Sequence, residues 1–180
     1  MSQRRVGTLF VLLSVAAFGS GGCSLVLDFD KPPVDAPPDS PVNDAACMAF
    51  EPNDSPDAAM TITAGEYQAA ICGGGETDYF KVTMNGSDML TARISFDNRN
   101  GAGDLDIRLL NATGGSTIDE SRTSANEETV NCPGGIMCNG PLPAADYLIH
   151  VLGFNAAVQA EYTLTLEISA VAVDAGVDAP

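Results

Sequence analysis

Short runs in which apolar and polar residues alternate recur along the middle of this chain, and this period of two constrains its fold more than any other feature. The clearest run is 162–168, where every second residue is apolar. Side chains of a β-strand point alternately to its two faces, so the pattern is typical of strands with one buried face. The same alternation appears over 80–84, 90–96 and 105–109, and the mostly apolar run 147–152 predicts a central strand.

Turn signals separate these runs at short intervals. They are Asn85-Gly86, Asn100-Gly101, Gly114-Gly115, Pro133-Gly134-Gly135 and Asn139-Gly140. Glycine and asparagine tolerate the positive φ angles that tight turns require. Only residues 55–60 are compatible with a helical turn. Seven or eight short strands at this spacing predict an all-β fold, an antiparallel and jelly-roll-like β-sandwich.

The charge balance excludes one broad class of function. The 180 residues include 24 acidic and 8 basic side chains, which gives a net charge of −16. A protein that binds nucleic acid neutralises phosphates with clustered lysines and arginines, and the few basic residues here are scattered. We therefore expect no nucleic-acid partner.

Residues 1–22 are typical of a secretion signal, with two arginines, a short apolar run and then small residues that lead to Cys23. The apolar run is too short to span a bilayer comfortably. The end of the segment resembles the bacterial lipobox, which implies cleavage before Cys23 and covalent lipid, such as palmitate, on Cys23. Ser20 stands where a lipobox usually has leucine. The alternative is a plain signal peptide and a secreted protein.

A lipid on Cys23 would place the protein in the cell envelope. Two or more acyl chains anchor a protein stably. Ser24 follows the anchor, and in the familiar bacterial sorting rule this favours the outer membrane. Cleavage leaves 6 basic and 24 acidic residues, a net charge of −18 that anionic lipid headgroups repel. The acyl anchor is therefore the only membrane contact that we expect.

Composition divides the rest of the chain into three parts. Residues 23–46 are rich in proline and aspartate and predict an extended tether. Residues 47–169 hold the alternating runs and predict the β-sandwich. Residues 170–180 are small, weakly acidic and aperiodic, which predicts a disordered tail.

Several motifs, in this order and spacing, resemble those of the bacterial pre-peptidase C-terminal domain. The resemblance covers about 51–168 and implies an antiparallel, jelly-roll-like sandwich. Members of that family usually accompany secreted peptidases and serve secretion, stability or substrate attachment. Ala145 occupies the usual place of a glycine in the last motif. The segments that carry the resemblance are Glu51-Pro52-Asn53-Asp54-Ser55, Gly75 to Phe80, Gly103 to Leu110, Asn126-Glu127-Glu128 and Ala144 to Val151.

Four cysteines remain after Cys23, and in a secreted chain we expect disulfides. Four cysteines allow three pairings. We favour Cys132–Cys138, which closes a short loop, and Cys47–Cys72, which would hold the incoming tether against the first strand. A zinc site is disfavoured because no Cys-x-x-Cys pair exists and the single histidine is distant in sequence.

Side chains with oxygen ligands cluster at 51–54 and again at Glu76 and Asp78, and calcium prefers ligands of this kind. In the related collagen-binding domains of clostridial collagenases, the opening segment and the aspartate at the strand entry contribute calcium ligands. Glu51, Asn53, Asp54 and Asp78 match those positions. A further acidic position in that pattern is Ala49 here. The alternative is that Asn53 and its neighbours form Asx turns and cap a helical turn.

Other candidate residues have plainer interpretations. Asp104 and Asp106 flank Leu105, and we expect both to be solvated, with Arg108 as the partner of Asp106. His150 lies in a strand run and is interpreted as a packed or surface histidine, not a catalytic base. No catalytic motif with nucleophile, metal or phosphate-loop spacing occurs after the signal.

These features predict a non-catalytic cell-envelope lipoprotein that displays a binding module. Its expected partner is an extracellular protein or a polymer such as a polysaccharide. The alternative is an accessory that localises or stabilises a separate secreted peptidase.

Overall fold

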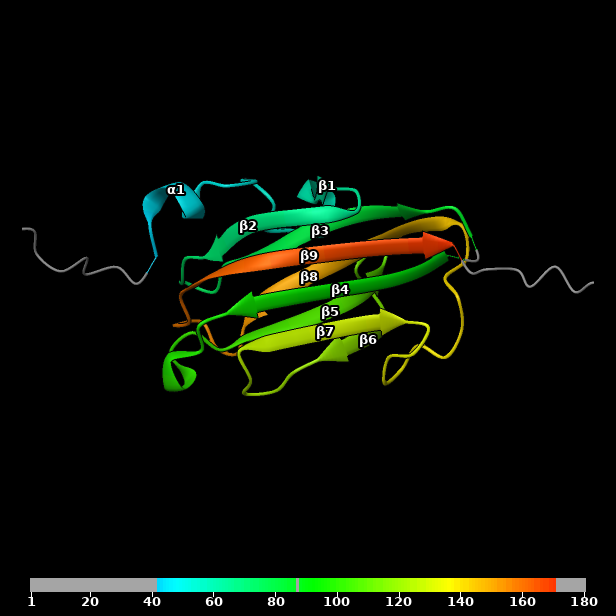
Figure 1. Ribbon diagram of the computed structural model, residues 1–180. Coiled ribbons are helices and arrows are strands. Elements are labelled where there is room, and N and C mark those ends of the chain that lie inside the picture. The colour runs from blue at the N-terminus through cyan, green and yellow to red at the C-terminus, as the bar shows by residue number, and fades with distance from the viewer. Residues whose placement is uncertain (1–41, 87, 171–180) are drawn as a thin grey trace, which may run out of the picture. The chain divides into compact units, whose positions relative to one another are not determined.

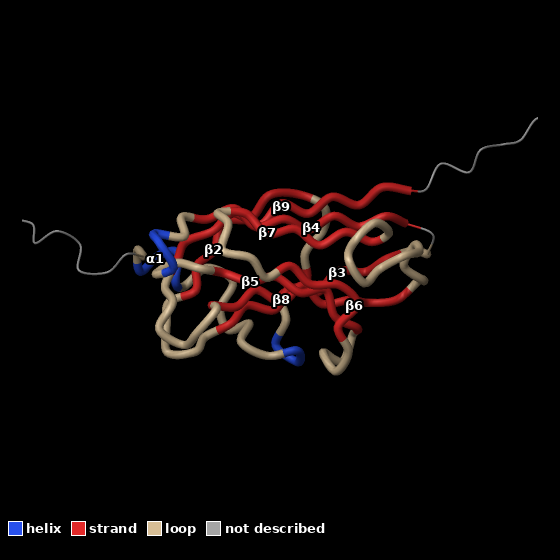
Figure 2. Tube along the Cα trace, turned by 90° about the horizontal axis from the view of Figure 1, so that it is seen from below, coloured by secondary structure: helices blue, strands red, loops and turns tan. Residues whose placement is uncertain are grey.

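The computed structural model describes residues 42–86 and 88–170. These residues form two β-sheets that pack face to face (Figure 1). Figure 2 shows the same two layers of strands from a perpendicular direction. The predicted all-β sandwich is therefore confirmed. The predictions for the signal, Cys23, most of the tether and the tail concern residues that lie outside the described part of the chain.

One sheet has five strands in the order β1-β3-β8-β5-β6, and the other has four in the order β2-β9-β4-β7. Neighbouring strands are antiparallel except for β1 and β3, which are parallel. The nine strands exceed the predicted seven or eight because two-residue β1 is too short to show an alternating pattern. The strands are β1 (Met60–Thr61), β2 (Gly65–Ile71), β3 (Thr77–Met84), β4 (Asp88–Phe96), β5 (Leu105–Asn111), β6 (Thr117–Ser121), β7 (Glu127–Cys132), β8 (Ala145–Gly153) and β9 (Ala160–Ala170).

The core lies between the sheets, and the alternating residues fill it. In β9, Leu164 and Leu166 are buried and face Ile94 and Ala92 of β4 in the observed register. Strand β8 lies between β3 and β5, and Tyr147 to Val151 are all buried, as expected for a central strand. Burying one large aliphatic side chain contributes about 1.5–3 kcal/mol to folding.

Both disulfides that the sequence favours are present. Cys47 pairs with Cys72, and Cys132 pairs with Cys138. The second closes the loop after β7, and the buried Asp119 carboxylate braces this loop by accepting hydrogen bonds from the backbone N–H groups of Met137 and Asn131, both at 3.0 Å.

Helical structure is confined to three short segments among the described residues. Helix α1 (Asp44–Cys47) begins within the stretch expected to be tether, because Asn43 caps it and the Glu161 side chain holds the backbone N–H of Asn43 at 2.9 Å. A 3-10 turn at Pro56–Ala58 confirms the helical turn predicted for residues 55–60. A third turn, Arg99–Gly101, was not expected. No helix in the described part of the chain is long and apolar enough to cross a membrane.

Candidate functional site

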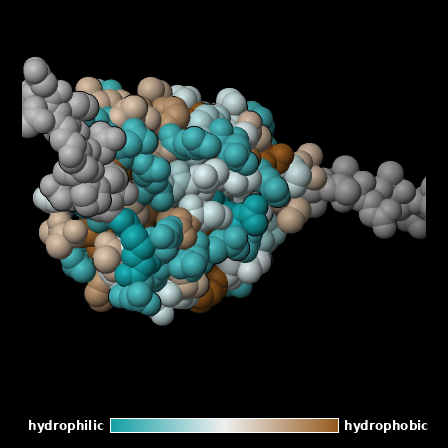
Figure 3. Space-filling model, turned by 60° about the vertical axis from the view of Figure 1, so that its left-hand side comes forward, coloured by the Kyte–Doolittle hydropathy of each residue, from teal (hydrophilic) through white to brown (hydrophobic). Residues whose placement is uncertain are grey.

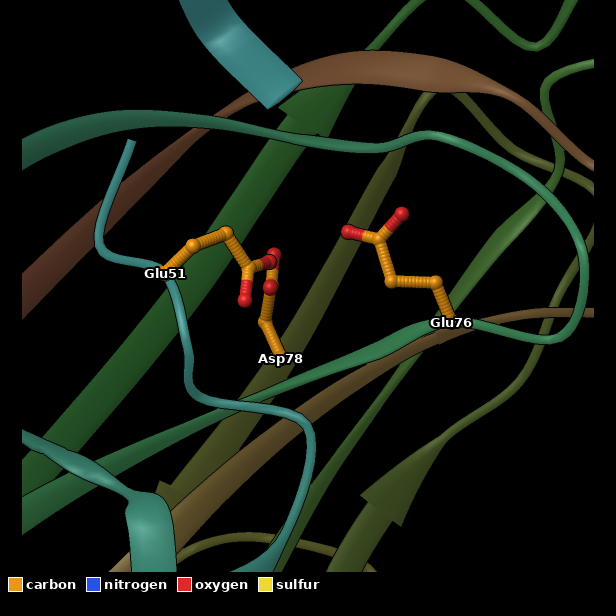
Figure 4. Close-up of side chains that lie close together, drawn as sticks. All are labelled: Glu51, Glu76 and Asp78. Carbon is orange, nitrogen blue, oxygen red and sulfur yellow. The ribbon is translucent and has the colours of Figure 1, made fainter. Parts of the chain in front are cut away.

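Three carboxylates meet where the chain enters the sandwich. Glu51 belongs to the segment that follows α1, Glu76 to the turn before β3, and Asp78 is the second residue of β3. One oxygen of each lies within 4.8 Å of an oxygen of the other two. Figure 4 shows the three side chains directed toward a common space. We call this group the junction site.

Backbone contacts explain why Glu51 reaches a strand that begins 26 residues later. The backbone N–H of Tyr79 donates to the carbonyl oxygen of Asn53 at 2.9 Å, so the entering segment lies alongside the start of β3. Glu51 in turn accepts a hydrogen bond from the backbone N–H of Asn53 at 3.1 Å. On the other side of the junction site, Glu76 accepts a hydrogen bond from the backbone N–H of Cys72 at 2.8 Å.

The Asn53 side chain is the least satisfied polar group of the site. It is fully buried, and neither Oδ1 nor Nδ2 has a hydrogen-bond partner among the described residues. It lies close enough to Asp78 to lower the pKa of that carboxyl. Oε1 of Glu76 is likewise buried without a partner. Unpaired buried polar groups are costly, and two of these unpaired atoms, Asn53 Oδ1 and Glu76 Oε1, are oxygens of the kind that a cation binds.

The pKa values of the acids reflect the same imbalance. Burial raises the pKa of Asp78 to about 7, a donated hydrogen bond from the Tyr162 hydroxyl opposes the rise, and the negative charges of Glu76 and Glu51 add to it. The pKa of Glu76 is also raised, mainly by burial and further by Glu51 and Asp54. Negative charges held this close repel one another unless a proton or a cation neutralises them.

The structure unites part of the residue set expected to bind calcium. Glu51 and Asp78 belong to the carboxylate group, and Asn53 lies beside them. Asp54 is exposed and lies outside the group, whereas Glu76 lies inside it. The sequence groups Glu76 with Asp78 as a cluster of carboxylates, although the resemblance does not include Glu76 among the ligands. Alternate residues along an extended strand point to the same face, which brings these two carboxylates together.

The expectation for Asp104 and Asp106 was wrong. Both are buried, with 9% and 2% of their surface exposed. The partner of Asp106 is Arg122, at 3.3 Å, and Arg108 instead lies 3.4 Å from Glu120. Asp104 and Asp106, which we expected at the surface, are therefore buried, and among the described residues only Asp106 has an arginine partner.

His150 is packed, as predicted. Its ring stacks on that of Tyr79, with centroids 4.1 Å apart, and Nε2 is buried without a partner. Burial lowers its pKa to about 4, and the positive charge of Arg108 adds to this effect.

Comparisons with known proteins identify no family for this chain. No protein-family pattern matches it, and no curated protein sequence does. Solved structures resemble its fold at low identity. The pre-peptidase C-terminal domain of a collagenase from Bacillus anthracis is 14% identical, with 61% of this chain and 94% of that domain covered and a TM-score of 0.48.

Two further neighbours have comparable coverage. PliG from Aeromonas hydrophila, a periplasmic inhibitor of g-type lysozyme, is 15% identical over 62% of this chain and 96% of its own, with a TM-score of 0.44. A Yersinia pseudotuberculosis-derived mitogen is 16% identical over 62% of this chain and 90% of its own, with a TM-score of 0.40. These likenesses concern the fold alone.

Proposed function

We propose that the protein is a non-catalytic binding module of the cell envelope, and that calcium completes its fold at the junction site. The observation that carries the calcium proposal is the fully buried Asn53 amide, which lacks partners beside three converging carboxylates. An ion at this position would accept the Asn53 Oδ1 and the carboxylates of Glu51, Glu76 and Asp78 as ligands. All of these are hard oxygen donors.

The chemistry of the donors favours calcium over other metals. Zinc prefers sulfur and imidazole ligands, and the nearby Cys47 and Cys72 are joined in a disulfide. Magnesium prefers to keep several waters in strict octahedral geometry. Calcium accepts irregular sets of protein oxygens, such as side chains contributed by a loop, a turn and a strand.

The position of the junction site suggests its role. Glu51 and Asn53 belong to the entering segment, whereas Asp78 belongs to the sandwich. A cation shared between them would fasten the segment to β3 and so define how the module is held on its tether. We retain the lipid on Cys23 and the outer membrane as parts of this proposal, with the acyl chains as the only membrane contact.

The non-catalytic assignment rests on the histidine and on the site chemistry. The chain has a single histidine, and it is the buried His150. At the junction site Asp78 is buried and Glu51 and Glu76 are half-buried, and we assign these converging carboxylates to a cation and not to a substrate. We propose an extracellular protein or a polysaccharide as the partner. The accessory role beside a secreted peptidase stays a prediction from sequence.

Thermal unfolding of the purified protein with calcium and with chelator tests the proposal. Calcium at 100 times its dissociation constant should add about 2.7 kcal/mol to the free energy of unfolding, a shift of about 10 °C. Glu51→Gln should abolish the shift and should also raise the melting temperature in chelator, because it removes charge repulsion. Glu66→Gln, an exposed change of equal charge in β2, serves as the control. If calcium leaves the melting temperature of both the parent protein and Glu66→Gln unchanged, the calcium proposal is wrong, and Asn53 and its neighbours form only a turn and a helix cap.

A further inference from the structure

A second concave surface lies away from the junction site, beside β5 and β6. It is a hollow of about 530 Å³ whose lining includes Asp104, Asp106, Arg122 and Phe154. It opens near the β4–β5 and β8–β9 loops, at the end of the sandwich that also carries α1 (Figure 1). The space-filling view toward that end shows mostly hydrophilic side chains with isolated apolar ones (Figure 3).

Phe154 gives the hollow an aromatic wall. About 64% of its surface is exposed, so its ring adds little to the core. Its backbone N–H donates to the carbonyl oxygen of Asp104 at 2.9 Å, which holds the β8–β9 loop against the start of β5. This backbone contact brings Phe154 close to Asp104, and both residues line the hollow.

Asp104 is the carboxylate with spare accepting capacity. It is about nine-tenths buried yet lines the hollow. Its only side-chain hydrogen bond among the described residues comes from a neutral group, the Nδ2 of Asn98, which donates to Oδ1 at 3.1 Å. A carboxylate has about four acceptor positions on its two oxygens, so Oδ2 is free to accept a donor from a guest.

The charges around the hollow do not balance. Arg122 pairs with Asp106, but the neighbouring Glu128 accepts hydrogen bonds only from neutral groups, Ser121 and Thr123. Among the described residues, Asp104 and Glu128 therefore have no basic ion-pair partner, and Arg122 pairs with Asp106. The pKa values of Asp104 and Asp106 are both raised, first by burial and then by neighbouring carboxylates, although Arg122 lowers that of Asp106. An added positive charge would relieve this repulsion.

We propose that this hollow binds a basic side chain, arginine or lysine, presented by a partner protein. The carboxylate of Asp104 would accept its N–H groups, and the face of Phe154 would lie against the cation, an arrangement that is attractive for both guanidinium and ammonium ions. The volume is in the range of pockets that enclose small organic groups and exceeds what a single ion needs. In the described part of the chain, the carboxylates that lie close enough together to hold a metal ion are those of the junction site. We therefore propose an organic cation, and not a metal ion, for the hollow.

This proposal names a partner chemistry for the binding module and so rests on the proposed binding role, but not on calcium. Its test is therefore run in chelator. The full chain, isotopically labelled, is titrated with N-acetyl-arginine N-methylamide and with the lysine analogue while two-dimensional NMR spectra are recorded. The citrulline analogue, in which a neutral urea replaces the guanidinium, is the matched probe.

We expect saturable shifts for residues 104–106, 120–124 and 153–155 with the two cationic probes, and none with citrulline. Phe154→Ala should weaken binding about two- to fivefold, whereas Met48→Ala, another exposed apolar residue, should leave it unchanged. Asp104→Asn should weaken it about tenfold, and Glu66→Gln, with the same change of net charge, should not.

Three outcomes would overturn the proposal. Equal shifts with citrulline would show that charge is not recognised. Loss of binding in Glu66→Gln as large as that in Asp104→Asn would indicate diffuse attraction to an acidic surface. Full binding in Phe154→Ala, whose exposed ring can be removed without unfolding the domain, would place the cation elsewhere. If calcium leaves the melting temperature unchanged while the cationic probes shift these NMR signals, only the calcium proposal for the junction site is refuted.

Discussion

The Tyr162 hydroxyl donates a hydrogen bond to the carboxylate of Asp78 through the core of the sandwich. Tyr162 belongs to β9 of the four-stranded sheet and Asp78 to β3 of the five-stranded sheet, and both are buried. The bond therefore joins the two layers at the point where the entering segment docks. It also places a charged group of the junction site in direct contact with the hydrophobic core.

Tyr162→Phe should destabilise the protein by about 1–3 kcal/mol at pH 8, because the ionised Asp78 loses a donor that water cannot replace. The loss should shrink at pH 5, where Asp78 is protonated. Urea unfolding at the two pH values checks this. Tyr67→Phe is a suitable control, since the Tyr67 hydroxyl bonds only to the nearby backbone of Thr63. An equal loss at both pH values would contradict the link to the charge of Asp78.

Stability without calcium should fall as the pH rises through 7. Asp78 has a pKa of about 7 in the folded protein and about 3.9 when unfolded. Between these values the folded state holds a proton that the unfolded state has released, so the free energy of unfolding declines with rising pH. Chemical denaturation in chelator at pH 6 and 8 measures the decline. Asp78→Asn should remove most of it, and a decline unchanged in this variant would refute the assignment.

His150 should produce the opposite slope at lower pH. Its pKa is about 4 when folded and about 6.5 when unfolded. In this window the unfolded state binds the extra proton, so stability falls as the pH falls from 6.5 toward 4. His150→Phe keeps a ring against Tyr79 and removes the titration. The variant should lose less stability than the parent protein between pH 6.5 and 4.5, as measured by thermal unfolding.

Gly135→Ala should destabilise the loop after β7 by at least about 2 kcal/mol. An added Cβ would lie 1.9 Å from the Asp119 carboxylate and 2.4 Å from the carbonyl oxygen of Asn131. Gly140→Ala, in the same loop region, meets no atom within 4 Å and should be neutral. Comparing the denaturation midpoints of the two variants tests the contact. Equal midpoints would mean that Asp119 does not brace the loop.

Much of the fold could be predicted because strands with one buried face have a local signature. The alternation over 162–168 and 90–96 identified β9 and β4, and the apolar run 147–152 identified β8. Helix α1 was missed because a four-residue helix has no apolar period, and its stability comes from the Asn43 cap and the distant Glu161.

The misassigned partner of Asp106 shows why the acidic sites were harder to predict. Asp106 and Arg108 are two residues apart on one strand face, which suggested that they pair. The β5–β6 register places Arg108 opposite Glu120, and Arg122, two residues further on and just past the end of β6, lies beside Asp106. Residues directly opposite on adjacent strands are closer than residues two apart along one strand. The pairing therefore depends on a register that a single strand does not encode.

The sequence by itself determined the strand-rich class and the turn positions, because both depend on residues that are near in the chain. It favoured one of three possible pairings of the four cysteines, and the structure shows that pairing. Only the tertiary structure decided which acids share an environment. Glu51 joins Glu76 and Asp78, which are two residues apart, because a backbone bond from Tyr79 to Asn53 holds the entering segment against the start of β3. Burial then makes their charges interact strongly, and burial is a property of the packed sandwich that no short stretch of sequence contains.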